Sequence, residues 1–118
     1  MSLLYEAAIK GLAPSTVVDS LPAPPDPFAE ALVRGVEANA AQIDALVASA
    51  SVGWEIDRMP IVDRTVLRLA TLELLERPGT PVAVVLDEAV ELVKQYSTDQ
   101  SGAFVNGVLS TVARQVRP

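Results

Sequence analysis

The stretch MPIVDRTVLRLATLELL, residues 59–75, decides the fold class. Pro60 fits the first turn of a helix and Pro78 with Gly79 ends the helical pattern, so the spacing predicts one long helix over about residues 60–77. Apolar side chains cover most of its circumference and leave only narrow polar strips. A helix of this kind is buried among others, so the sequence predicts a helical bundle with this segment in its middle.

Apolar residues recur at helical spacing on both sides of this segment. Asp26 followed by Pro27 fits an N-cap with proline at the first helical position, and the stripe from Phe28 to Val47 predicts one continuous helix of about five turns. Similar stripes predict further helices over residues 82–96 and 101–116, and shorter ones near 3–12 and 15–20. No stretch alternates as a strand does. The predicted fold class is all-α, a compact bundle of about five to seven helices.

Composition limits the chemistry open to this chain. Its 118 residues, 50% of them hydrophobic, are enough for one domain with a sizeable core. The chain has no cysteine and no histidine, which excludes disulfides, thiol nucleophiles, imidazole bases and the commonest zinc sites. It also has no glycine-rich phosphate loop. We therefore expect a protein that is not an enzyme and that uses no cofactor and no metal.

The charge balance limits what the chain can bind. Nine basic and 15 acidic residues give a formal net charge of -6, so overall charge cannot hold a nucleic acid and any RNA contact must come from a local patch. No apolar run approaches the roughly 20 residues that span a bilayer, and no signal-peptide pattern opens the chain. We expect a cytoplasmic protein without a membrane partner.

Three motifs carry a resemblance to a known family. VDR-x-x-LR begins at Val62, DEAVEL at Asp87 and FVNGVL at Phe104. In this order and spacing they resemble the NusB family of transcription antitermination factors, and the similarity extends over nearly the whole chain. It implies two small helical subdomains, an N-terminal helical half at about residues 1–50 and a C-terminal helical half at about 51–118.

The resemblance also implies a function. NusB proteins bind the boxA element of nascent leader RNA together with NusE, which is ribosomal protein S10. The complex joins other Nus factors on RNA polymerase and promotes processive ribosomal RNA transcription. We therefore expect an RNA-binding adaptor with these partners, and a homodimer is also compatible with the sequence. Two alternatives stay open: the NusB-like RNA-binding domain of an rRNA methyltransferase, and a purely structural helical module that dimerises.

One segment of the family pattern is missing. NusB proteins normally open with an Arg/Lys-rich run that helps to hold RNA, whereas this chain begins two residues before its LLYEA match at residues 3–7. Three explanations stay open: Met1 and Ser2 are an added segment before a truncated product, the short form is natural, or the start codon is misassigned. We expect weak RNA binding because the net charge repels phosphate.

Three charged residues are candidates for partner binding. Asp63 lies in the first turn after Pro60, where a carboxylate interacts favourably with the helix dipole, and we expect it to be exposed. The resemblance assigns the acidic residue at this position a contact with the ribosomal protein. Arg64 and Arg68 are four residues apart on one helix face, which suits either a solvated strip or the rim of an interface.

Three other residues are candidates for RNA binding. Gln100 and Phe104 match positions that touch RNA in NusB proteins, and Tyr5 fits the family's RNA or partner surface. Ser101 is predicted to be the N-cap of the last helix, and Phe104 lies about 100° from the centre of that helix's apolar stripe. The ring of Phe104 therefore either closes the core or presents a face on which a base can stack. The alternative for Tyr5 is a packed ring with a solvated hydroxyl.

Three further residues are expected to be structural. Trp54 lies between two predicted helices and is expected to be a packing wedge rather than an interaction site. Glu73 falls on the apolar arc of its helix, so a cap or an arginine should satisfy it. Gly107 lies inside a helix, where glycine costs about 1 kcal/mol relative to alanine, so we expect a close helix approach there.

Overall fold

The computed structural model describes the backbone of residues 2–117, which forms helices and no strand. Met1, half of the proposed added segment, lies outside the described residues. The elements are α1 (Ser2–Lys10), α2 (Pro14–Asp19), α3 (Pro27–Ala38), α4 (Ala40–Ala50), the 3-10 helix η1 (Ile56–Arg58), α5 (Ile61–Glu76), α6 (Val82–Tyr96) and α7 (Asp99–Val116). The all-α prediction is confirmed. Within these residues, no helix is long and apolar enough to cross a membrane.

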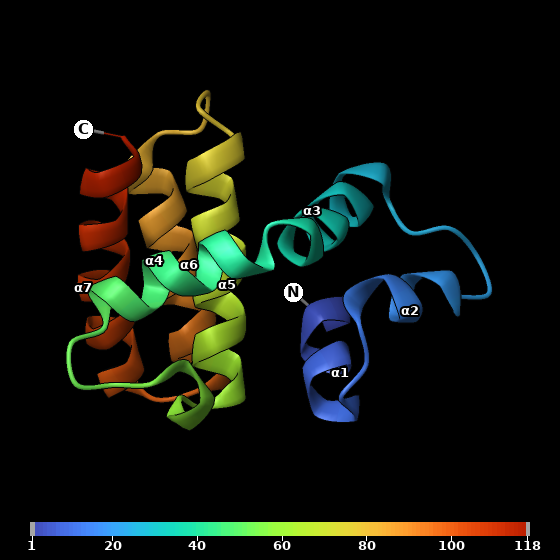
Figure 1. Ribbon diagram of the computed structural model, residues 1–118, viewed down its shortest axis with the longest axis horizontal. Helices are drawn as coiled ribbons and strands as arrows, with labels where there is room; N and C mark the ends of the chain where they lie inside the picture. Colours follow the sequence, from blue (N-terminus) through green and yellow to red (C-terminus); the bar gives the residue numbers. More distant parts are fainter. Residues whose placement is uncertain (1, 118) are drawn as a thin grey trace.

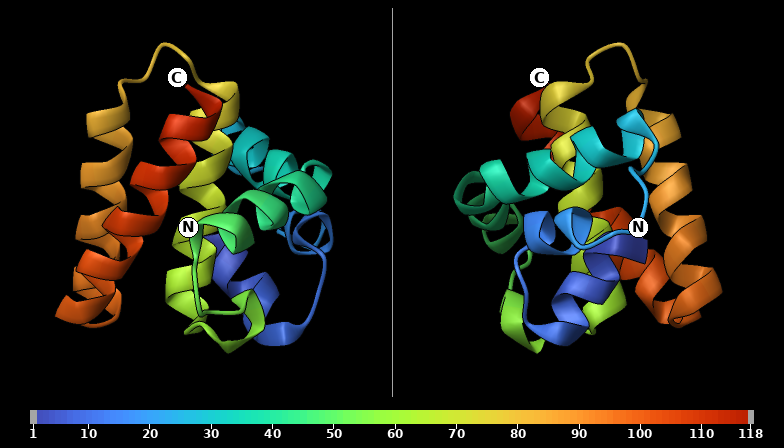
Figure 2. Two further views of the ribbon diagram at one scale, coloured as in Figure 1. Left: turned by 60° about the vertical axis from the view of Figure 1, so that its left-hand side comes forward. Right: turned by 90° about the vertical axis from the view of Figure 1, so that its right-hand side faces the viewer.

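Helix α5 lies at the centre of the bundle, as its all-round apolar surface predicts. It packs against α1, α3, α4, α6 and α7. Helices α5, α6 and α7 lie side by side, α4 crosses α5 and α7, and α1 to α3 lie on the other side of α5 (Figures 1 and 2). One continuous apolar core joins both sides of α5. The division of the chain near residue 50 stays a prediction.

The predicted continuous helix over residues 28–47 is wrong in one respect, because it breaks at Asn39 into α3 and α4. The Asn39 amide donates to the Gly35 carbonyl at 2.8 Å and to Glu76 Oε1 at 3.0 Å. A side chain that takes a backbone acceptor in this way competes with the helical hydrogen bonds and bends the chain. Asp26 caps α3 as predicted, since its Oδ2 accepts from the amides of Phe28 and Ala29 at 3.1 Å.

The first residue of the predicted stripe, Phe28, lies outside the core. Its side chain is 53% exposed, and the Arg77 guanidinium lies over its ring, 4.6 Å from the centroid. This cation-π contact holds the start of α3 to the end of α5.

Gly35 lies on α3 where this helix packs against α5. A Cβ at Gly35 would stand 2.9 Å from Cδ2 of Leu72, a side chain that is 1% exposed. At Gly107, by contrast, a Cβ would meet nothing within 4 Å. The predicted close approach at Gly107 is therefore wrong, because α7 turns that face away from the other helices.

The C-terminal end of the chain returns to the turn between α5 and α6 (Figure 2). There the Arg117 guanidinium donates to backbone carbonyls at the end of α5 and in the turn that follows it. The acceptors are the carbonyl oxygens of Glu73 at 3.1 Å, Leu74 at 2.9 Å, Arg77 at 2.7 Å and Thr80. This clamp joins the last residues of the chain to the central helix.

Candidate nucleic-acid interface

The loop between α4 and α5 turns the Trp54 indole outward. Ser51 ends α4 by donating its hydroxyl to the Val47 carbonyl at 2.6 Å, and Gly53 takes a φ of +85°, which a side chain would strain. The Trp54 amide then closes a turn on the Ser51 carbonyl at 3.0 Å. Trp54 is 53% exposed, so the expected packing wedge is wrong, and Met59, 4% exposed, is the residue of this segment that enters the core.

The first turn of α7 lies against the first turn of α5. Thr98, and not Ser101, is the N-cap: its hydroxyl accepts from the Ser101 amide at 3.1 Å. The helix therefore begins earlier than predicted, and Ser101 lies inside its first turn. The Ser101 hydroxyl is free to face α5, where it donates to Asp63 Oδ2 at 2.8 Å.

Asp63 is buried rather than exposed, which corrects the sequence prediction. The residue is only 3% exposed because α7 covers it. One carboxylate oxygen is held by Ser101, and Oδ1 has no hydrogen-bond partner among the described residues. A buried carboxylate oxygen without a partner is costly to the stability of the fold.

A surface pocket of about 340 Å³ connects these two regions. The rings of Trp54 and Phe104 lie 5.8 Å apart between centroids and are tilted by 57°. Phe104 is half-buried and packs on the edge of the core, as the helical wheel predicts, while Gln100 is exposed. The residues that line the pocket are Trp54, Met59, Pro60, Asp63, Thr98, Gln100, Ser101 and Phe104.

The pocket therefore brings together residues from both predicted sites. Asp63, assigned from the sequence to protein binding, shares a wall with Gln100 and Phe104, which were assigned to RNA binding. Trp54 also lines this pocket. Its place there could not be predicted from the sequence, because the exposure of a loop residue depends on the turn that precedes it. The mixed hydrogen-bonding and aromatic lining suits a nucleobase.

Lys94 supplies a basic side chain near the first turn of α7. It is exposed on α6, and its stem lies across Gly102: a Cβ at Gly102 would stand 3.3 Å from Lys94 Cε. The sequence offers no local signal for this placement, since Lys94 resembles any charge on the solvated face of α6. The structure shows that it lies over Gly102, which is two positions and about 200° around α7 from both Gln100 and Phe104, so Lys94 is on the opposite face of this helix.

Arg64 and Arg68 are not a solvated strip. Arg68 forms a two-pronged pair with Asp44, from Nε to Oδ1 at 2.9 Å and from Nη2 to Oδ2 at 3.1 Å, which ties α5 to α4. Arg64 is half-buried, and its Nε is buried without a hydrogen-bond partner among the described residues. The pair with Asp44 gives Arg68 a structural role, and it does not prevent Arg68 from also contacting a partner.

Tyr5 lies apart from the aromatic pocket. It is 39% exposed on α1 and lines a different hollow of about 360 Å³ with Val62, Leu92 and Tyr96, from α5 and α6. Tyr96 is also an exposed aromatic residue, at 58%. The structure therefore does not bring Tyr5 together with Gln100 and Phe104.

The charge of Glu73 is not fully balanced by a cap or an arginine, as the sequence predicted it would be. It is half-buried beside α6, and burial raises the pKa of its carboxyl above the ordinary value. Glu88 raises this pKa further, while the opposing effect of Arg77 is smaller than that of burial. The expected pairing with an arginine is thus incomplete, because the attraction of Arg77 does not offset the loss of solvation of the Glu73 carboxylate.

The helical fold and its aromatic pocket define an all-helical binding protein. The family model described as "NusB family" matches residues 8–114. The transcription antitermination protein NusB of Streptomyces griseus is 44% identical over 117 residues, which cover 92% of this chain and 82% of that protein. The chain therefore belongs to the NusB family.

Solved structures agree with this assignment. NusB of T. maritima has 34% sequence identity and a TM-score of 0.88, over 99% of this chain and 87% of that one. A structure of antitermination factors NusB and NusE in complex with dsRNA contains a chain with 29% identity and a TM-score of 0.79, over 96% of this chain and 89% of that one. The predictions of the family and of a helical adaptor rather than an enzyme are confirmed.

Proposed function

We propose that this chain is a transcription antitermination factor that acts in the cytoplasm as an RNA-binding adaptor. It binds the boxA element of nascent leader RNA together with ribosomal protein S10 (NusE), and through them joins other Nus factors and RNA polymerase. Membership of the NusB family supports this role, as does the similarity to a chain in a complex of NusB, NusE and dsRNA. The single observation that carries it is the open pocket formed by Gln100 and Phe104 with Trp54.

The RNA surface of this proposal lies around the first turn of α7. Gln100 is exposed there and offers an amide to a base edge, and Phe104 offers a ring. With a net charge of -6 the rest of the chain repels RNA, so the contact is short and depends on this patch.

The protein surface of this proposal includes Tyr5 and the face of α5 beside it. The apolar neighbours of Tyr5, namely Val62, Leu92 and Tyr96, suit a protein partner better than a phosphate chain. Arg64 and Arg68 belong to the same helix as Val62 and stay candidates for the edge of the contact. Asp63 is not part of this protein surface, because its burial prevents a direct contact with S10.

The test is a pair of titrations on the whole chain, one with single-stranded boxA RNA followed by anisotropy and one with purified S10 followed by calorimetry. Phe104→Leu and Gln100→Ala should weaken RNA binding and leave S10 binding unchanged, whereas Tyr5→Asp should do the reverse. Asn106→Ala is the matched control, since Asn106 is exposed on α7 about 200° around the helix from Phe104. Absence of binding to both ligands, alone and together, would refute the proposed function.

A methyltransferase-linked domain is the alternative within the same family. It predicts RNA binding that is indifferent to S10, because its catalytic domain would take the place of the partner. Binding that S10 strengthens by at least tenfold, which is about 1.4 kcal/mol of coupling, favours antitermination.

A further inference from the structure

We propose that the protein surface beside Tyr5 continues along the groove between α5 and α6 and ends at a pair of carboxylates, Glu73 and Glu88, which receives a lysine or arginine side chain of S10. The inference rests on the proposed function, in which Tyr5 and the face of α5 beside it contact this partner. It adds a second contact at the far end of the groove, and the occupant of that contact is a cation of the partner protein.

The groove is continuous along the two helices. It consists of a hollow of about 360 Å³ near Tyr5 and a smaller one of about 60 Å³ near Glu73, and Leu92 lines both. The α5 residues that line the hollows recur at helical spacing and so share one face of this helix. They are Val62, Val66, Leu69, Ala70 and Glu73. At a rise of about 1.5 Å per residue, the distance along α5 from Val62 to Glu73 is about 16 Å.

Most of the groove is apolar or aromatic. Tyr5 and Tyr96 are exposed at one end, at 39% and 58%. Leu69 and Leu92 are only partly buried along its length. Exposed tyrosines beside apolar side chains are typical of protein interfaces, and an apolar floor gives a phosphate chain nothing to bind. The occupant that suits this part of the groove is therefore a polypeptide.

The other end of the groove carries negative charge that the chain itself does not balance. Glu73 is half-buried, Glu88 is exposed, and neither forms a salt bridge with the described residues. Burial, and next Glu88, raise the pKa of Glu73, so the free protein disfavours the charged form of this carboxyl. An ammonium or guanidinium group has several donors and can bond to both carboxylates, which would relieve their repulsion.

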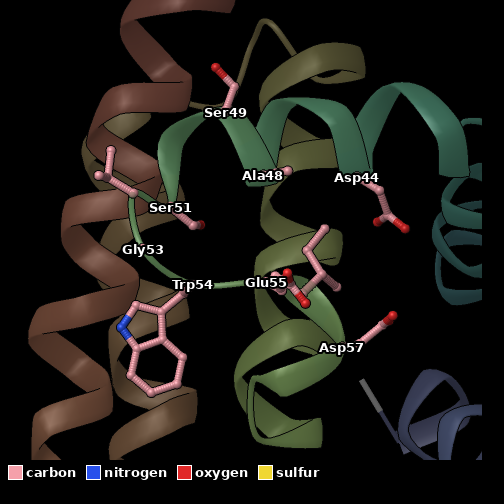
Figure 3. Close-up of a pocket in the computed structure, with 10 residues that line it drawn as sticks. Asp44, Ala48, Ser49, Ser51, Gly53, Trp54, Glu55 and Asp57 are labelled. Carbon is pink, nitrogen blue, oxygen red and sulfur yellow. The ribbon is translucent and has the colours of Figure 1, made fainter.

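A larger hollow of about 890 Å³ beside the loop after α4 also has acidic side chains, but cations of this chain lie beside two of them. Figure 3 shows Asp44, Glu55 and Asp57 along this hollow. Arg68 pairs with Asp44 at 2.9 Å. Arg58 lies 3.8 Å from Glu55. A basic partner therefore gains more at Glu73 and Glu88 than at this hollow, where two of the three carboxylates already have a cation.

The experiment is a calorimetric titration of the whole chain with purified S10 at low and at high salt. Glu73→Gln and Glu88→Gln should each lower the affinity about tenfold at low salt and make it depend less on salt, because each removes one charge from the contact. Asp87→Asn is the matched control, since it removes the same charge from an exposed position of α6 outside the groove. Glu73→Gln is expected to stabilise the fold, so unfolding cannot explain a loss of affinity in this variant.

A second variant tests whether the two ends of the groove belong to one contact. Tyr96→Ala should also weaken S10 binding, because it removes an exposed ring at the end opposite to Glu73. Since the two positions lie far apart and share no partner, their factors should multiply in the double variant. Val84→Ala is the control, because Val84 is 42% exposed on α6 outside the groove.

The cation itself is found from the side of the partner. Each lysine and arginine of S10 is changed in turn to glutamine and titrated against the original chain and against Glu73→Gln. One of these changes should weaken binding to the original chain about tenfold and have little effect on binding to Glu73→Gln. Such a cycle measures the coupling of the two side chains directly, because a side chain that contacts neither carboxylate weakens both complexes equally.

Two results would overturn the inference while leaving the proposed function intact. One is S10 binding with the original affinity and salt dependence in both Glu73→Gln and Glu88→Gln. The other is self-association of the chain in analytical ultracentrifugation that Tyr96→Ala abolishes without changing S10 affinity, which would assign the groove to a second copy of this chain. Failure of S10 and of RNA to bind the original chain would instead count against the proposed function.

Discussion

The hydroxyl of Ser101 donates to Asp63 Oδ2 at 2.8 Å, across 38 positions of sequence. This bond joins the first turn of α7 to the first turn of α5 inside the fold. It sets the position of Gln100 and Phe104 relative to the loop of Trp54, and so holds the aromatic pocket in shape. A single buried pair therefore connects the stability of the bundle to the geometry of the proposed RNA surface.

Ser101→Ala should destabilise the protein by about 1–3 kcal/mol, because it leaves a buried carboxylate without its hydroxyl donor. The measurement is the urea dependence of helical circular dichroism. Ser110→Ala is the control on the same helix: its hydroxyl donates to the Asn106 carbonyl one turn earlier. That control should change the unfolding free energy by no more than about 0.5 kcal/mol. Equal effects of the two substitutions would contradict a special role for the Asp63 bond.

Asp63→Lys should prevent folding or cost more than about 3 kcal/mol, because the ammonium would be buried without a partner. This outcome differs from the mild effect that an exposed position would give. Asp57→Lys, the same charge reversal at an exposed site in η1, should be tolerated within about 0.5 kcal/mol. Thermal unfolding of the two variants side by side distinguishes a buried from an exposed Asp63.

Arg117→Ala should cost about 2–3 kcal/mol, since it leaves several carbonyl oxygens at the end of α5 without their charged donor. Arg114→Ala provides the comparison: this residue is exposed three positions earlier and donates to the Thr111 hydroxyl. Its loss should stay within about 0.5 kcal/mol. Chemical denaturation of both variants gives the difference, and a tolerated Arg117→Ala would show that the clamp adds nothing to stability.

Gly107→Ala should stabilise the protein by about 0.5–1 kcal/mol, because alanine is the better helix former and the added methyl group meets nothing within 4 Å. Gly35→Ala should instead destabilise it by about 1–3 kcal/mol, because the new Cβ would stand 2.9 Å from Leu72 in the core. The opposite signs are the diagnostic result in thermal unfolding. Two changes of the same sign would mean that Leu72 can move aside.

Glu73→Gln should stabilise the protein near neutral pH. Burial, and next Glu88, raise the pKa of Glu73 in the folded state, so the folded protein binds a proton more readily than the unfolded chain. Stability therefore falls as pH rises from the unfolded pKa through the raised folded pKa, and the lost stability stays lost above it. The glutamine variant should escape this decline.

The measurement is the urea midpoint of Glu73→Gln and the original chain at several pH values. The two should converge in acid, where Glu73 is protonated in both states, and differ above the raised pKa. Glu91→Gln removes the same charge from an exposed position on α6 and serves as the control. A constant difference across the whole pH range would contradict the proposed titration.

The sequence by itself determined the fold class and the family. The apolar circumference of residues 59–75 requires a buried helix, and the flanking stripes supply its neighbours. These features are encoded at short range, by helical periodicity and by residues such as Asp26 and Pro27 that start a helix. The motifs VDR-x-x-LR, DEAVEL and FVNGVL identified the family for the same reason, since each is contiguous.

Only the tertiary structure decided what each candidate residue faces. Asp63 and Glu73 both lie on α5, yet α7 covers the first and donates a hydrogen bond to it, while the second borders α6 with incomplete compensation. Trp54 turns outward because of Ser51 and Gly53, and Gly107 meets no neighbour while Gly35 does. The physical reason is that burial and hydrogen-bond partners come from segments distant in sequence, whose docking no local pattern records.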